Sequence, residues 1–248
     1  MGVRSIRALA SNIFNQAVEW GFLKSSPAHN LKVEGKPVER DRFLNQDELE
    51  QFVHSLSQEG GSIVDFFLLA LLTGVRRGNV CVMCWEEINL GLATWKIPRT
   101  KNGDPQIVML SPDAVEILRA RREKYGGKGF VFPGSGSTGH FVDARTAIKR
   151  VLDRAGIPYG RNVPNGVTLH DLRRTLGSWQ AIGGASLPII GASLGQKSQK
   201  ATAIYARLNS QAVRDSVEKA GAKMLSLAGL KEGESLLDFL ESKRESNT

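Results

Sequence analysis

A nearly continuous apolar segment runs from Ile63 to Thr73 and ends at Gly74. This pattern predicts a strongly apolar helix, because glycine readily takes the left-handed conformation that closes a helix. The segment contains Asp65 and is too short to cross a bilayer. Most other periodic segments are also helical in pattern. The sequence therefore predicts a mainly α protein with a small antiparallel β-sheet, an α+β fold.

Capping residues place the starts of two further helices. Asn45 is followed at the capping-box position by Glu48, which predicts a helix that runs to about Leu56. Ser111 and Pro112 predict a helix that continues to about Tyr125. The 3.6-residue period predicts further helices over residues 3–20, 143–155, 169–182, 187–194, 200–207 and 210–227, and a short amphipathic helix over 234–243.

Two short segments have the composition of strands, residues 94–97 and 106–110. They flank the sequence Lys101-Asn102-Gly103-Asp104, and an Asn-Gly step is a common hairpin turn. These segments predict an antiparallel pair with Lys101 in its turn. Residues 130–132 are a candidate third strand of the same sheet.

The charge of the chain indicates an anionic partner. Its 248 residues carry a formal net charge of +8, with a pI of about 9.7. Nucleic acid is the commonest partner of such a protein, although a merely basic soluble protein has the same balance. Two cysteines are too few for a disulfide framework, and the lone pair Cys81 and Cys84 lacks the further ligands of a zinc site. We interpret them as small residues on a helix behind Arg76.

Five residues have the chemistry that metal-free cleavage of a phosphodiester requires. They are Arg76 after Leu-Thr-Gly-Val, Lys101 in its turn, His170 and Arg173 three residues apart, and Tyr205 behind the sequence Leu-Gly-Gln-Lys-Ser. Arginines can neutralise the charge of a phosphate, lysine and histidine can transfer protons, and a tyrosine oxygen can attack phosphorus.

In order and context these residues resemble the tyrosine recombinase family, also called phage integrases, from about Phe43 to about Leu208. The resemblance implies a site-specific DNA recombinase that cuts and rejoins DNA through a 3′-phosphotyrosyl intermediate, for integration or excision of a mobile element. Tyr205 would be the nucleophile, and Arg76 and Arg173 would hold the phosphate. His170 would assist proton transfer with the tyrosine, and Lys101 would protonate the departing 5′ oxygen.

Each of these residues also has an ordinary structural interpretation. Tyr205 could be a packed core residue of an amphipathic helix, and Lys101 could be a solvated turn residue. The two arginines and His170 could be polar residues of helix surfaces. Their neighbours Arg77 and Arg174 match no family position, and we interpret both as non-specific DNA contacts. The combination of all five in the family order favours the functional interpretation.

Two positions depart from the family pattern. Gln196 stands nine residues before Tyr205, where the family usually has histidine or tryptophan. Asn79 stands three residues after Arg76, where the family usually has an acidic residue. Glutamine still donates a hydrogen bond to a phosphate oxygen, so Gln196 belongs to the predicted catalytic set. Losing one such donor costs on the order of a few kcal/mol of transition-state stabilisation, which predicts an active or slowed enzyme.

The resemblance also implies an organisation and a set of partners. Residues 1–41 are expected to be the end of a helical core-binding domain plus a linker, 42–228 the catalytic domain, and 229–248 a tail helix. The tail could pack on a neighbouring protomer or on its own domain. The implied partner is double-stranded DNA, bound by a homo-tetramer with or without accessory DNA-bending proteins. Neither membrane, metal, ATP nor another cofactor is expected, and the implied location is the bacterial cytoplasm, for a bacterial or phage-encoded protein.

Three other functions stay open at this point. A regulatory DNA-binding relative with a dead site is favoured slightly by Gln196 and Asn79. A type IB topoisomerase shares the tyrosine chemistry, but the core-binding remnant argues against it. A basic helical interaction domain would leave five ordered residues unexplained. Basic residues that are candidates to line a DNA face are Arg119, Arg121, Arg122, Lys124, Lys149, Arg150 and Arg154.

Overall fold

The computed structural model describes residues 3–31, 40–99, 103–196 and 198–229, together with Ser235, Leu237 and Phe239. The chain divides into two compact units, Met1–Arg40 and Asp41–Thr248. In the first unit, helix α1 spans Val3–Glu19. Its apolar side chains Ile6, Leu9 and Ile13 are about half exposed.

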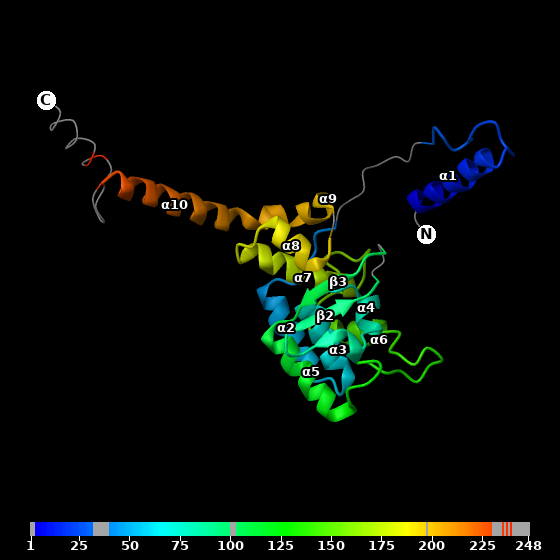
Figure 1. Ribbon diagram of the computed structural model, residues 1–248, viewed down its shortest axis with the longest axis horizontal. Coiled ribbons are helices and arrows are strands. Elements are labelled where there is room, and N and C mark those ends of the chain that lie inside the picture. Colours follow the sequence, from blue (N-terminus) through cyan, green and yellow to red (C-terminus); the bar gives the residue numbers. More distant parts are fainter. Residues whose placement is uncertain are drawn as a thin grey trace. The chain divides into compact units, whose positions relative to one another are not determined.

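The second unit contains the sheet and the other helices (Figure 1). Its described elements are α2 Gln46–Ser57, α3 Ser62–Thr73, α4 Arg77–Cys81, the 3₁₀ helix η1 Trp85–Glu87, β1 Ile88–Asn89, β2 Thr94–Ile97, β3 Gln106–Met109, α5 Pro112–Tyr125, α6 Arg145–Arg154, α7 Leu169–Ile182, α8 Leu187–Leu194, α9 Gln199–Thr202, the 3₁₀ helix η2 Ala203–Asn209 and α10 Ser210–Leu227. The mainly α architecture with a small antiparallel sheet is confirmed.

The capping residues act as their sequence predicts. Asn45 caps α2 through a capping box with Glu48, and the Ser111 hydroxyl accepts from the backbone of Ala114 at the start of α5. Gly74 closes α3 in the left-handed conformation, with φ of 58°. A side chain there would collide with Leu194 and Leu176, so Gly74 also lets α7 and α8 approach the end of α3.

Helix α3 lies inside the main hydrophobic core. Phe66, Phe67 and Leu69 are fully buried, and α3 contacts both α5 and α7. Its only acidic residue, Asp65, forms an ion pair with Arg121 of α5, whose Nη1 lies 2.7 Å from Oδ2. Arg121 is 2% exposed and also donates to the Val131 carbonyl. Arg121 is therefore part of the core and is not available to line a DNA face.

Arg150 and Arg154 of α6 are also engaged within the protein. Both bind the Glu59 carboxylate, Arg154 at 3.0 Å, and together they lower the pKa of Glu59 to about 2. The hydrogen bond from Arg150 is the largest cause of this shift in pKa. Like Arg121, these two candidates for a DNA face are therefore paired with a carboxylate of the protein itself.

The sheet has the strand order β1-β2-β3, with both pairings antiparallel. Trp95 pairs with Val108 and Ile97 pairs with Gln106. The prediction that residues 130–132 form a third strand is wrong, because Ile88–Asn89 takes that place. Val131 donates instead to Met83, and Phe132 accepts from Phe141, so its backbone is used elsewhere. Only an isolated bridge joins Phe130 to Cys84.

Two other local predictions need correction. Residues 200–207 do not form one α-helix, since α9 ends at Thr202 and Tyr205 lies on η2. Cys81 is on α4, but Cys84 lies beyond it, before η1. The predicted tail helix falls largely outside the described residues. In the part of the chain that the structure describes, we find no helix with the length and apolar character of a membrane span.

Candidate active site

A capping box sets the start of α7, which carries His170 and Arg173. The carboxylate of Asp171 accepts from the Thr168 backbone at 2.7 Å and from the Thr168 hydroxyl at 2.8 Å. Its other oxygen accepts from Arg174 at 2.5 Å. Asp171 is fully buried, so this network fixes the first turn of the helix. Arg174, interpreted from sequence as a DNA contact, is thus paired with a buried carboxylate.

Arg173 is held by two backbone carbonyls from different elements. Its Nη1 donates to Gly74 at the end of α3, at 2.7 Å, and its Nη2 donates to Leu194 at the end of α8. The residue is 3% exposed. Burial lowers the pKa of Arg173 to about 10, with Arg76 contributing in the same direction, so the guanidinium stays charged at neutral pH. The two carbonyls fix its plane, and a guanidinium has further N–H groups with which it can bind an anion.

Arg76 and His170 lie near enough to this guanidinium to interact with it electrostatically. Arg76 is the residue before α4, and its charge acts on both Arg173 and His170. Desolvation lowers the pKa of His170 to about 4, and Arg174, Arg173 and Arg76 act in the same direction. The residue is nonetheless exposed to solvent, and water moderates this shift in the pKa of His170. At neutral pH the imidazole is therefore uncharged, which is the form that can accept a proton.

Tyr205 is packed inside the molecule, at 2% exposure. It belongs to a small apolar cluster with Ala181, Ile190 and Leu194, and its ring lies against Gly177 of α7. Burial raises the pKa of Tyr205 above its usual value, while Arg173 and a hydrogen bond from Gln196 act to lower it. The sequence argument that arginines favour the phenolate is correct in direction, but burial outweighs them in the chain without DNA.

Three consecutive residues connect α8 to this site. Leu194 accepts from Arg173, Gly195 closes α8 with φ of 58°, and the Gln196 side chain bonds to Tyr205. Sequence reasoning identified Gln196 but missed Gly177, which allows the close approach of Tyr205. A glycine inside a helix pattern was the available signal, because such a glycine commonly has a packing reason.

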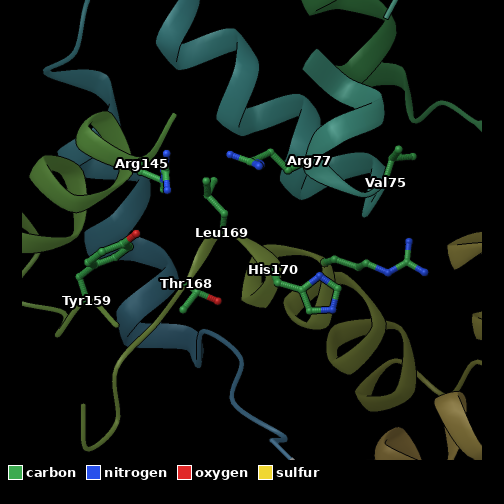
Figure 2. Close-up of a pocket in the computed structure, with 8 residues that line it drawn as sticks. Val75, Arg77, Arg145, Tyr159, Thr168, Leu169 and His170 are labelled. Atoms are coloured by element: carbon green, nitrogen blue, oxygen red, sulfur yellow. The ribbon is translucent and has the colours of Figure 1, made fainter. Parts of the chain in front are cut away.

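An open pocket of about 330 Å³ adjoins His170 and Arg173. Figure 2 shows Arg77 and Arg145 extending toward one another above Leu169, with Tyr159 beside Arg145 and His170 on the other side. The Asp143 carboxylate forms ion pairs with both arginines, with Oδ1 at 4.0 Å from Arg77 Nη1 and Oδ2 at 2.9 Å from Arg145 Nη2. The pocket therefore offers two guanidinium groups with one carboxylate between them.

Two predicted residues remain, Lys101 and Asn79. Lys101 lies outside the described residues. Asn79 is in the first turn after Arg76, and its backbone N–H donates to the Arg76 carbonyl at 2.9 Å. Within the described ranges, no group of three or more histidine, cysteine, aspartate or glutamate side chains is placed to hold a metal ion.

Comparison with known proteins identifies the family and the fold of the chain. Residues 42–212 match the sequence profile of the phage integrase family. The chain belongs to the phage integrase family. It is 32% identical over 135 residues to a shufflon-specific DNA recombinase of Escherichia coli, covering 54% of this chain and 35% of that protein. It is 28% identical over 202 residues to the integrase of Salmonella phage P22, covering 77% of this chain and 49% of that one. This integrase-family chain thus spans half or less of the length of these relatives.

Solved structures of recombinases share the fold of this integrase-family chain. The crystal structure of XerA recombinase covers 88% of the chain with a TM-score of 0.56 and 20% identity, over 77% of its own length. The integrase of the Tn1549 transposon, solved in complex with circular intermediate DNA, covers 89% with a TM-score of 0.64 and 14% identity, over 81% of its own length. At these identities the likeness concerns the fold.

Proposed function

We propose that this chain carries the catalytic domain of a site-specific DNA recombinase, which breaks and rejoins DNA through a covalent bond between Tyr205 and a 3′ phosphate. The observation that carries the proposal is the junction of α3, α7, α8 and η2. There a buried, carbonyl-braced Arg173 acts electrostatically on Tyr205, and Gln196 donates to the phenol. A cation and a neutral donor around a buried phenol favour a phenolate and an anionic phosphate together.

The first step forms one bond and breaks another. The Tyr205 oxygen attacks the scissile phosphorus, the bond from phosphorus to the 5′ oxygen breaks, and the phenol proton goes to a base. His170 suits that role because it is uncharged at neutral pH. Arg76 and Arg173 balance the charge of the phosphorane. Lys101 would protonate the departing 5′ oxygen. In the second step, a 5′ hydroxyl of the partner strand attacks the phosphotyrosyl bond and releases Tyr205, so the ester energy is conserved.

Binding of DNA has to change the surroundings of Tyr205. The phenol is 2% exposed, whereas attack requires its oxygen to face the phosphate. We therefore expect the short α9 and η2 segment to shift when DNA binds. Leaving its apolar contacts would relieve the burial that raises the pKa of Tyr205. The phosphate anion acts in the opposite direction, so the positive charges of Arg76 and Arg173 are needed to offset it.

The pocket between Arg77 and Arg145 suits a second phosphate of the same strand. It adjoins His170 and Arg173, and its two guanidinium groups can bind phosphate oxygens. This supports the earlier interpretation of Arg77 as a DNA contact and adds Arg145. Assembly of four protomers on two DNA sites, exchange of strands for a mobile element, accessory bending proteins and a cytoplasmic location are further proposals that follow from family membership.

A covalent adduct would test the proposal directly. The chain would be incubated with duplex DNA that carries the ends of its own element, with a nick near the cut site to trap the intermediate. The expected result is a protein–DNA adduct on a denaturing gel, which Tyr205→Phe abolishes. DNA binding without any adduct would favour a regulatory relative instead, with the burial of Tyr205, Gln196 and Asn79 as its structural reasons.

A further inference from the structure

Two buried side-chain atoms near the proposed nucleophile have no hydrogen-bond partner among the described residues. They are Nε2 of Gln106 and Oε1 of Gln196. The first is an N–H donor and the second an acceptor, so each is what the other lacks. Buried polar groups are nearly always paired, and an unpaired one calls for an explanation.

Gly195 brings the two glutamines together. Gln106 begins β3 and pairs with Ile97, and β3 contacts α8 (Figure 1). The Gln106 amide lies flat on Gly195, because a side-chain carbon on that glycine would be 2.3 Å from Cδ and Oε1 and 2.6 Å from Nε2. Gly195 is the residue directly before Gln196. Nε2 of Gln106 therefore lies beside the backbone that leads into Gln196, whose Oε1 is the unpaired acceptor.

The other end of the Gln196 amide is already defined. Its hydrogen bond to Tyr205 lowers the pKa of that phenol, so the bond comes from the NH₂ end and favours the phenolate. Oε1 then points away from the phenol, which agrees with its lack of a partner. An amide has nearly the same shape in either orientation, so shape alone cannot keep the NH₂ end toward Tyr205.

We propose that Gln106 is a positioning residue that orients the Gln196 amide: one bridging water, or a small rotation of the Gln106 side chain, would join the Nε2 donor to the Oε1 acceptor. This inference rests on the proposed function, because it assigns Gln196 Nε2 to Tyr205 and to the scissile phosphate. A reversed Gln196 would turn its oxygen toward both anions and repel them. A tryptophan at position 196 would present only its indole N–H donor and would need no such partner. The pair Gln106 and Gln196 is thus a joint replacement for one ring N–H.

Two substitutions at Gln106 separate orientation from packing. Gln106→Met keeps the length and removes the donor, and Gln106→Glu replaces the donor with an acceptor. We expect the rate of adduct formation on nicked DNA to fall about tenfold in the first variant, a part of what losing an oxyanion donor costs, and further in the second. In a Gln196→Trp background, Gln106→Met should change the rate less than about twofold, since the indole N–H is a donor only and needs no orienting partner. Equal losses in both backgrounds would show a merely structural role and overturn the inference.

A second measurement does not depend on activity. The chain has 3 tyrosines, so the ring carbon that bears the phenol oxygen can be labelled with ¹³C and assigned. Gln106→Met should shift the Tyr205 signal at neutral pH, and it should have no effect when Gln196 is replaced by leucine. A responsive signal without any adduct would reject the proposed function and keep the positioning role. If an adduct forms, and Gln106→Met changes neither its rate of formation nor the Tyr205 signal, the positioning role alone is rejected.

Discussion

Tyr205 and Gly177 are in contact so close that no side chain fits between them. A carbon added to Gly177 would lie 2.5 Å from Cζ and 2.8 Å from the phenol oxygen of Tyr205. Gly177 is one helical turn beyond Arg173 on α7. The helix that supplies the guanidinium therefore also supplies the surface against which the proposed nucleophile is packed.

Gly177→Ala should separate folding from catalysis. Alanine stabilises a helix interior by up to about 1 kcal/mol relative to glycine, which offsets part of the collision with the ring. We expect the thermal unfolding temperature to fall modestly, because the collision is only partly offset, and adduct formation to fall about tenfold or more because η2 is displaced. Gly221→Ala on α10, where an added side-chain carbon would meet no described atom outside its own helix within 4 Å, is the control and should keep wild-type activity. Full activity of Gly177→Ala would contradict a fixed position for Tyr205.

Arg173→Lys should remove most of the chemistry while keeping the charge. A lysine cannot donate to both the Gly74 and the Leu194 carbonyls and still present a planar fork to a phosphate. We expect single-turnover adduct formation to fall about a hundredfold. Arg119→Lys, on the exposed side of α5, serves as the control. A variant that retains near wild-type rates would show that charge alone is sufficient at this position.

His170 should make the fold sensitive to mild acid. Its folded pKa of about 4 lies below the ordinary histidine value of 6.5, so between these values the unfolded chain binds a proton that the folded chain does not. The free energy of unfolding should therefore decrease as pH falls from about 6.5 toward 4. His170→Gln should flatten that decrease in urea titrations. Glu59 contributes in a separate window, because its pKa falls from 4.5 to about 2 on folding. A pH profile that the substitution leaves unchanged would contradict the assigned titration.

Arg145 should contribute to the salt dependence of DNA binding. If it binds a phosphate, Arg145→Ala should weaken binding and reduce the slope of log affinity against log salt by about 1. Asp143→Asn should have the opposite effect on affinity, because it removes the carboxylate between Arg145 and Arg77. Arg150→Ala, on the same helix but paired with Glu59, is the control and should leave the slope unchanged. Fluorescence anisotropy at several salt concentrations measures all three.

Local sequence was sufficient for much of the fold. Asn45, Ser111 and Gly74 marked helix ends because capping depends on hydrogen bonds and backbone angles within a few residues. The third strand was not predictable in this way. Ile88–Asn89 is too short to have a period, and residues 130–132 had the composition of a strand but pair with other segments.

The sequence by itself determined the fold class, the helix caps and the family, and the order and spacing of Arg76, His170, Arg173, Gln196 and Tyr205. The tertiary structure decided which groups touch. It set the burial that raises the pKa of Tyr205 and the pair of carbonyls that accept from Arg173. It also placed Tyr205 on the 3₁₀ helix η2 and brought Gln106 into contact with Gly195. These features depend on groups far apart in the chain, and desolvation and hydrogen-bond geometry are properties of the packed state alone.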